Sequence, residues 1–400
     1  MISVKNGFKG NWANVALLIF VASIPTLSIY SVKIMILLLV VSFFLPANGS
    51  LKKLFLSAWA CLLYFGILIL GLLQTDHLNT GLSVLETNFS FIAIPIIFFK
   101  VKKSGFRLED VLYSFVVGIG LACLICLTTA CYKYSQNGEA KVFLYYQFTE
   151  VLDFQPTYFA YFISFAISVL LYFIHYNKNK FSTWLHLILI IFLFVPLMLT
   201  AGRTAYVAML FVFAFYILKF LFEEKRNFNS TFTFRTSSLL LISMLLINYL
   251  DINANYNLSE NNNDYWERLE LWKSGLLANT DFLFGVGTGD YKTALNDYFL
   301  KHGYINYAKE NYNAHNQFIQ TFLSNGLLGV LSLLLLMGWP LYLSVKYQNV
   351  LGIMTFFSFF IYGITEVFLG RYQGVVFFSF LNQFFTSHYL SQNKSESISE

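Results

Sequence analysis

Long apolar runs recur along almost the whole chain, and each has about the length of a membrane-spanning helix. A helix needs roughly 20 apolar residues to cross about 30 Å of hydrocarbon. The runs are continuous rather than alternating in polarity, which favours helices over strands. We therefore expect an all-α fold, a polytopic membrane bundle of about 12 transmembrane helices. The predicted spans are 12–30, 32–46, 54–73, 84–99, 109–131, 156–175, 183–200, 203–221, 236–251, 316–345, 349–369 and 372–389.

One long polar stretch, at 252–314, interrupts this pattern between the ninth and tenth spans. It contains Trp266, Leu269, Trp272 and Leu276, spaced three and four residues apart, as on one face of a helix. Such a Trp-rich amphipathic helix is typical of a membrane surface. We expect residues 1–400 to form a single integral membrane domain, with 252–314 as a large extracytoplasmic helical loop.

A glycine-rich segment, Gly285-Val286-Gly287-Thr288-Gly289-Asp290, lies within this loop. A nucleotide-binding loop would follow a strand and precede a Lys-Ser or Lys-Thr pair, and neither is present. The segment is therefore predicted to be a flexible turn, with Asp290 as a cap for a short helix over 291–300.

The composition agrees with a membrane protein, because 57% of the residues are hydrophobic and only 12% are charged. The charged fraction is about half that of an ordinary soluble domain. The Cys123-x-x-Cys126 pair could indicate a redox or metal site, but it lies in an apolar span without histidine or carboxylate neighbours. Small buried hydrophobic side chains are the favoured interpretation. We expect no cofactor, no metal and no nucleic-acid partner.

The basic residues predict the orientation of the spans. With a cytoplasmic N-terminus, sixteen of the 26 basic residues fall on the inner side, whereas the short outer loops hold only five. Those five are Lys33, Lys133, Lys141, Arg203 and Arg371. Because Lys and Arg gather in cytoplasmic loops, both termini are predicted to be cytoplasmic and the 252–314 loop to lie outside. The net charge of +5 is explained by this asymmetry.

Three residues near the predicted outer face could carry chemistry. Arg203, in Thr200-Ala201-Gly202-Arg203, either extends from a helix end to the membrane surface or binds an anion beside small residues. Arg268 either contacts lipid phosphate and nearby glutamates or binds a phosphate substrate. His315, in Asn313-Ala314-His315-Asn316, opens the tenth span, where a lone histidine is more often structural than catalytic.

Two further charged residues bracket the turn between the last two spans. Glu366 and Arg371 flank Phe368-Leu369-Gly370, again at the predicted outer face. An ionisable side chain within a span is costly, so we expect Glu366 to face the bundle interior or a basic partner. Arginines can hold a diphosphate while a histidine accepts a hydroxyl proton. The set is compatible with metal-independent glycosyl transfer from a lipid diphosphate.

These residues lie in motifs that resemble a known family. The motifs are Thr200-Ala201-Gly202-Arg203, Glu267-Arg268-Leu269-x-x-Trp272, Phe284-Gly285-Val286-Gly287, Ala314-His315-Asn316 and Asn325-Gly326-Leu327-Leu328-Gly329. Their order and spacing over about 190–385 are similar to those of the O-antigen ligase and O-antigen polymerase superfamily of bacterial envelopes. The first half of the chain matches only as a run of spans.

The resemblance implies a multi-pass inner-membrane enzyme of about twelve spans, whose active site faces the periplasm. The implied donor is an undecaprenyl-diphosphate-linked glycan. Carried over by motif, Arg203 and Arg268 would bind the diphosphate, and His315 would be the base toward the acceptor hydroxyl. Asn316, Trp272, Glu366 and Arg371 are expected to bind substrate, although the family pattern around the last two is looser.

The resemblance leaves the acceptor open. A ligase transfers the glycan to the lipid A core, whereas a polymerase transfers it to a second lipid-linked repeat unit. The motifs through His315 and Gly326-Leu327-Leu328-Gly329 favour the ligase. A transporter of lipid-linked glycans is the rival class. Transporters usually show paired half-repeats and helices broken by Gly or Pro near the bilayer midplane. This sequence has no visible duplication and only six prolines, which disfavours that class.

Overall fold

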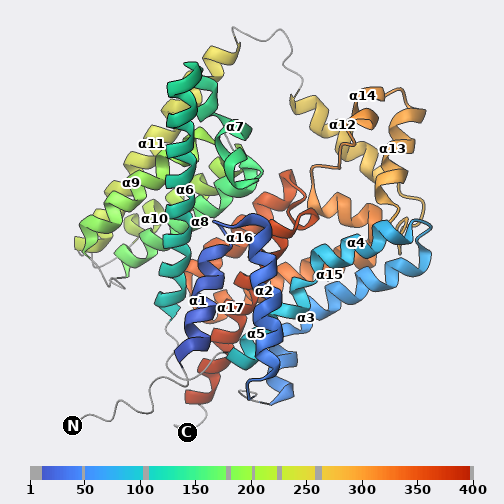
Figure 1. The fold of residues 1–400 in the computed structure, drawn as a ribbon, viewed down its shortest axis with the longest axis horizontal. Coiled ribbons are helices and arrows are strands. Elements are labelled where there is room, and N and C mark those ends of the chain that lie inside the picture. Colours follow the sequence, from blue (N-terminus) through green and yellow to red (C-terminus); the bar gives the residue numbers. More distant parts are fainter. Residues whose placement is uncertain are drawn as a thin grey trace. The chain divides into compact units, whose positions relative to one another are not determined.

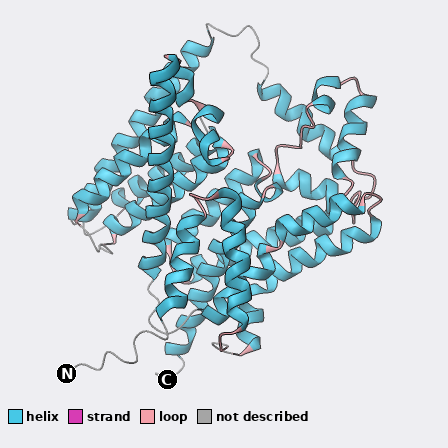
Figure 2. Cartoon of the chain, in the orientation of Figure 1, coloured by secondary structure: helices cyan, strands magenta, loops and turns pink. Residues whose placement is uncertain are grey.

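The computed structural model describes residues 11–46, 50–101, 108–176, 182–200, 203–222, 228–256 and 264–396 of the chain. These residues form α-helices and short 3-10 helices, with no strand among them (Figure 2). The predicted all-α class is therefore confirmed.

Six helical segments in the described ranges are long and apolar enough to cross a membrane. They are Leu51–Gln74, Leu78–Val101, Leu108–Asn137, Pro156–His175, Thr204–Leu221 and Gln317–Lys346. Four shorter apolar segments, Trp12–Ser23, Tyr30–Phe43, Thr183–Leu199 and Val350–Thr365, accompany them. The chain is thus a multi-pass membrane protein, while the count of about 12 spans and their orientation stay predictions.

The helices form two compact units. The sequence did not predict this division. The first unit comprises Met1–Ile34 and Lys103–Glu260, and the second Met35–Lys102 and Asn261–Glu400. Helix α2 (Ser28–Phe43) includes the boundary at residue 34. The first unit contains α1 (Asn11–Ser23), α6 (Leu108–Asn137), α7 (Tyr145–Thr149), α8 (Pro156–His175), α9 (Thr183–Leu199), α10 (Arg203–Leu221) and α11 (Phe228–Tyr256).

Helix α8 is the core of the first unit. In this helix 94% of the span is buried, because α6, α9, α10 and α11 all pack against it. Helices α1 and α6 also approach closely at Gly118, where an added Cβ would meet the carbonyl of Ala22. The Thr26 hydroxyl donates to the Gly118 carbonyl oxygen at 3.1 Å. Small residues permit such close contacts between membrane helices.

The second unit is built around α17 (Tyr372–Glu396), in which residues 374–386 are all buried. Helices α3 (Leu51–Leu70), α5 (Ser90–Val101) and α15 (Gln317–Lys346) pack against it (Figure 1). Three polar side chains of α17 donate to these neighbours: Gln383 to the Ser57 hydroxyl at 3.0 Å, Asn382 to the Leu336 carbonyl at 3.0 Å and Ser379 to the Ser90 carbonyl at 2.8 Å. Interhelical hydrogen bonds of this kind satisfy polar groups that lipid could not.

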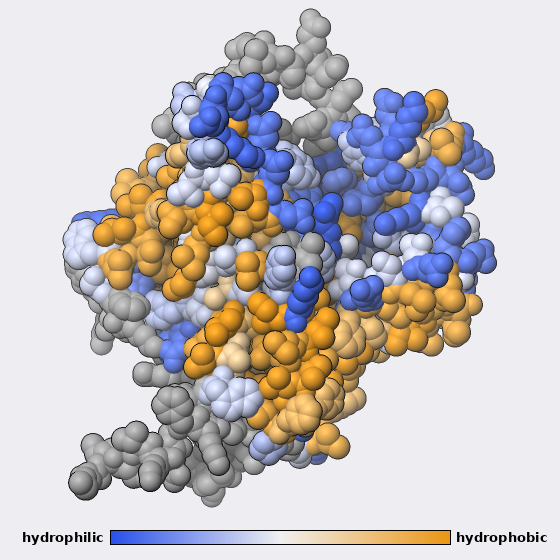
Figure 3. Space-filling model, viewed as in Figure 1, coloured by the Kyte–Doolittle hydropathy of each residue, from blue (hydrophilic) through white to orange (hydrophobic). Residues whose placement is uncertain are grey.

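The polar loop contributes α12 (Asp264–Leu277), α13 (Tyr291–Lys301) and α14 (Ile305–Lys309) to the second unit. In Figure 3 its surface is mostly hydrophilic, whereas hydrophobic surface covers α3, which packs beside α4 (Leu78–Asn88). The helix predicted around Trp272 is confirmed, but Leu269 and Leu276 are exposed. The buried face of α12 runs through Leu271, Ser274 and Gly275, so Leu269 and Leu276 of the predicted stripe do not pack on the protein.

Helix α15 is broken at Gly326, which the sequence did not predict. Gly326 has φ 60° and ψ −156°, a region that is essentially restricted to glycine. The segment 282–287 supplies the hydrogen bonds that the helix loses there. The amides of Val286 and Gly287 donate to the carbonyls of Leu323 and Ser324 at 2.9 and 3.0 Å.

The two amides beyond the break are satisfied in the same way. Leu327 and Leu328 donate to the carbonyls of Phe282 and Leu283 at 2.8 and 3.2 Å. In an uninterrupted helix these amides would bond the carbonyls of residues 323 and 324. The loop therefore replaces two intrahelical bonds with four bonds of its own. The predicted turn at 285–290 is confirmed, but its backbone is bonded to α15 rather than left free.

The end of this turn is attached to the start of α4. The Asp290 carboxylate accepts from the amides of Asp76 and His77 at 2.8 and 2.9 Å and lies 2.7 Å from His77 Nδ1. Partial burial alone would raise the pKa of Asp290, but these hydrogen bonds outweigh it and hold the pKa below its usual value. Asp290 stands at the predicted N-cap position of α13, but its side chain makes no capping bond to that helix.

Replacing Gly326 with alanine should destabilise the second unit. The new Cβ would meet the Leu283 carbonyl and lie 2.5 Å from the Phe284 amide nitrogen, and the backbone angles alone cost roughly 1–3 kcal/mol. Gly338→Ala in the same helix is the matched control, because nothing lies within 4 Å of its Cβ position. Thermal unfolding in detergent should show a lower midpoint for Gly326→Ala only. Equal midpoints for the two variants would contradict the proposed role of the break.

Candidate functional site

The candidate site begins at His315, which stands between the polar loop and α15. Its backbone has φ 43°, a left-handed conformation that is uncommon outside glycine. The Asn313 Oδ1 atom accepts from the His315 amide at 2.7 Å, and the Trp272 indole approaches the His315 carbonyl oxygen at 3.4 Å. Asn316 caps α15 by accepting from the amides of Phe318 and Ile319. His315 is therefore held by contacts to its backbone, and its ring remains 26% exposed.

Arg268 reaches the same place from α12. This helix is fixed against α15 through its buried face, which includes Leu271 (1% exposed). The Nη1 atom of Arg268 donates to the Thr365 carbonyl oxygen at 2.7 Å. Thr365 is the last residue of α16 (Val350–Thr365), so this bond connects the polar loop to the end of a membrane helix.

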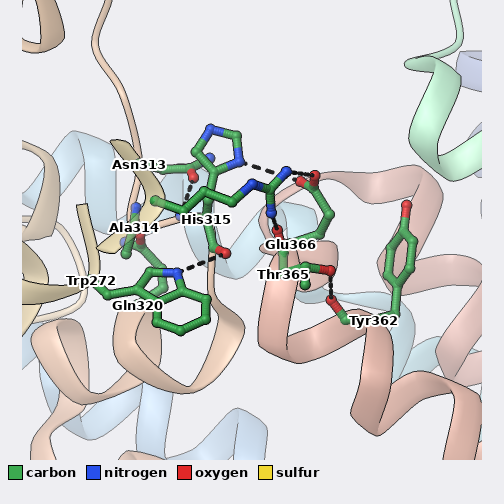
Figure 4. Close-up of polar contacts among 9 residues, drawn as sticks. Trp272, Asn313, Ala314, His315, Gln320, Tyr362, Thr365 and Glu366 are labelled. Carbon is green, nitrogen blue, oxygen red and sulfur yellow. Dashed lines mark hydrogen bonds and ion pairs between the residues drawn. The ribbon is translucent and has the colours of Figure 1, made fainter. Parts of the chain in front are cut away.

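Glu366 lies between these two basic residues. Arg268 Nη2 is 3.6 Å from its Oε1 atom, and His315 Nδ1 is 3.6 Å from its Oε2 atom. In Figure 4 the His315 ring presents one nitrogen to Glu366 and directs the other away from it. The Glu366 side chain is only 7% exposed. A buried carboxylate is costly without partners, and here it has two, as the sequence led us to expect.

The cluster leaves reactive groups available to a ligand. The guanidinium has five N–H donors and no acceptor, and the Arg268 side chain is 37% exposed. Its remaining donors can therefore bind phosphate oxygens in a fork. The exposed part of the His315 ring can accept or donate a proton. Anion binding and proton transfer are thus possible within one small site.

Trp272 and Asn316 are predicted to bind substrate, and in the structure their side chains contact the backbone around His315. The Trp272 indole faces the His315 carbonyl oxygen, and the side-chain Oδ1 atom of Asn316 is occupied in capping α15. Arg371 is exposed and directly follows η5 (Phe368–Gly370). None of the described residues forms an ion pair with it. The side chain of Arg203 lies outside the residues that the structure describes, so its predicted role stays a prediction.

Several supporting groups were missed by sequence reasoning. Gln317 accepts from the Leu369 amide at 2.8 Å, which fixes the turn after Glu366 to the start of α15. Gln320 accepts from the Ala314 amide at 3.2 Å. Both glutamines are buried on α15, at 3% and 6% exposure. A glutamine within a predicted span indicates that its side chain has a polar partner. The sequence does not identify that partner when, as for Gln317 and Leu369, it is distant along the chain.

Tyr312 lies beside the His315 ring. Its ring centroid is 5.9 Å from that of His315. Burial raises the pKa of Tyr312, and the neighbouring carboxylates of Glu267 and Glu310 raise it further. Tyr307, whose hydroxyl donates to Glu270 at 3.1 Å, has its pKa raised to about 12, mainly by burial. Both phenols are therefore protonated near neutral pH and act as hydrogen-bond donors.

The cysteines and the titratable groups give no sign of a further chemical centre. Cys61, Cys123 and Cys126 are free and buried, as predicted for small apolar side chains. Cys131 is free and exposed. Across the described ranges, no group of three or more His, Cys, Asp or Glu side chains is arranged to hold a metal ion.

A comparison with protein families matches residues 159–334 to the O-antigen ligase family model. The matched region includes Arg203, Arg268, Trp272, His315 and Asn316, whereas Glu366 and Arg371 lie beyond its end. The match confirms the resemblance seen in the motifs. A search of the curated proteins gives no match to the chain.

Proposed function

We propose that the chain, which matches the O-antigen ligase family model over residues 159–334, transfers a glycan from an undecaprenyl-diphosphate donor to the lipid A core. The reaction takes place at the periplasmic face of the bacterial inner membrane, with both termini of the chain in the cytoplasm. The observation that carries this proposal is the convergence of Arg268 and His315 on Glu366. That cluster joins an anion-binding group to a proton acceptor.

The donor diphosphate binds to arginine in this mechanism. The unused N–H groups of Arg268 donate to phosphate oxygens. The family resemblance assigns the same role to Arg203. Negative charge grows on the diphosphate as it leaves, so donors already directed at its oxygens stabilise the transition state more than the ground state. The exposed Arg371 and the ring of Trp272 contact the rest of the donor.

His315 acts on the acceptor. Its ring accepts the proton of the acceptor hydroxyl while that oxygen attacks the anomeric carbon of the donor glycan. The bond from this carbon to the phosphate oxygen breaks, and undecaprenyl diphosphate leaves. A positioned base of this kind contributes about 10² to 10⁴ in rate. No cofactor is required for these steps.

The acceptor distinguishes the favoured ligase from the alternative polymerase. The purified chain in proteoliposomes is given labelled undecaprenyl-diphosphate glycan with either lipid A core or a second lipid-linked glycan. Growth of labelled lipid A core is expected. Growth of the lipid-linked glycan alone would contradict the ligase assignment and support the polymerase. The family match supports the two activities equally.

A further inference from the structure

The two oxygens of Glu366 serve two different partners. Oε1 faces Arg268 and Oε2 faces Nδ1 of His315, each at 3.6 Å. No hydrogen bond to His315 Nδ1 is formed within the described residues, although this atom is buried. A movement of about half an ångström would bring either separation into hydrogen-bond range.

The chemistry of the three groups determines where the protons lie. An ionised carboxylate only accepts hydrogen bonds, and a guanidinium only donates them. A neutral imidazole carries one proton, on either of its nitrogens. With a carboxylate oxygen opposite Nδ1, the favoured tautomer has the proton on Nδ1. The lone pair is then on Nε2, the nitrogen directed away from Glu366 (Figure 4).

The geometry points to Glu366 as a positioning residue, which fixes the His315 tautomer so that Nε2 is the nitrogen that takes the proton from the acceptor hydroxyl. This inference rests on the proposed function and assigns the base to one atom. As Nε2 gains the proton, His315 becomes an imidazolium, and its positive charge is stabilised by the Glu366 carboxylate. Glu366 itself does not contact the substrate, because only 7% of its side chain is exposed.

The backbone around Glu366 is fixed from three sides. Its amide donates to the Tyr362 carbonyl oxygen at 2.9 Å, and the preceding Thr365 carbonyl accepts from Arg268. The turn that follows is held by the bond from Leu369 to Gln317 on α15. A carboxylate supported in this way holds the ring orientation before substrate binds, and little reorganisation is needed during reaction.

Glu366→Gln tests the inference because glutamine keeps the shape but not the two acceptors. Arg268 has only donors, so the amide oxygen of the glutamine must face it. The amide NH2 group then faces His315 Nδ1, which must become the acceptor, and the ring proton moves to Nε2. We expect kcat to fall about a hundredfold or more, with KM for the donor changed less than threefold. Glu366→Asp, which keeps the charge, should restore part of the lost kcat.

The tautomer is read directly by ¹⁵N NMR of histidine-labelled protein in detergent, with His315→Asn used to assign the signal. The wild type should show the proton on Nδ1 and Glu366→Gln should show it on Nε2. Glu86→Gln, an exposed glutamate on α4, is the matched control and should change neither kcat nor the signal. Thermal unfolding of each variant excludes loss of folding as the cause.

Wild-type kcat in Glu366→Gln, or a proton on Nε2 in the wild type, would overturn the inference. A wild type that transfers no glycan would contradict the proposed function instead. The NMR signal still decides the inference in that case, since it does not depend on turnover.

Discussion

His315→Ala and His315→Asn should both lose glycan transfer by at least about a hundredfold while the protein remains folded. The loss follows from removal of the proposed base, and a positioned base contributes about 10² to 10⁴ in rate. Asparagine is included because it tolerates the left-handed φ of 43° at this position better than most residues do. Initial rates of transfer in proteoliposomes and the thermal midpoint in detergent give the two readouts.

His302 offers a matched control for this experiment. It lies just beyond the end of α13, is exposed, and stacks on Tyr298 with ring centroids 4.0 Å apart. His302→Asn should therefore keep the wild-type rate. Full activity in either His315 variant would show that another group takes the acceptor proton.

Arg268→Ala should have an effect of similar size, for two reasons. It removes a proposed donor to the leaving diphosphate, and loss of one such donor typically costs about 10² to 10³ in kcat. It also removes the partner of a carboxylate that is only 7% exposed, which lowers stability. Arg268→Lys separates the reasons, because lysine keeps the charge but not the planar fork of donors.

The expected order of transfer rates is wild type, then Arg268→Lys, then Arg268→Ala, with donor binding weakened in the same order. Lys273→Ala is the control, since Lys273 is an exposed cation on the same helix. Arg268→Ala with normal transfer, or an equal loss in Lys273→Ala, would contradict the role of Arg268 in holding the diphosphate.

Local sequence pattern was enough to predict most helices and to single out the candidate site residues. A helix satisfies all its backbone hydrogen bonds within one segment, so a long apolar run in lipid is expected to be helical. Helices such as α8 and α10 therefore follow from composition and length. The cost of charge within a span similarly identified Glu366. We expected Glu366 to lie near Arg268 and His315 because all three residues are predicted to lie at the same face of the membrane.

The break at Gly326 could not be predicted in this way. Asn325-Gly326 lies in an apolar run that is otherwise typical of a continuous helix. The bonds that stabilise the break come from residues 282–287, about forty residues earlier in the chain. The backbone contacts of Trp272 and Asn316 were missed for the same reason. Both residues contact backbone whose position depends on how α12 packs against α15.

The central claim is that the chain breaks the bond between glycan and lipid diphosphate, rather than moving the intact lipid-linked glycan. Purified protein in proteoliposomes with a labelled undecaprenyl-diphosphate glycan and an acceptor tests this most directly. We predict release of one undecaprenyl diphosphate for each glycan joined to acceptor, and no release from His315→Ala. Intact donor that only changes leaflets, with no free lipid diphosphate, would contradict the account and favour a transporter.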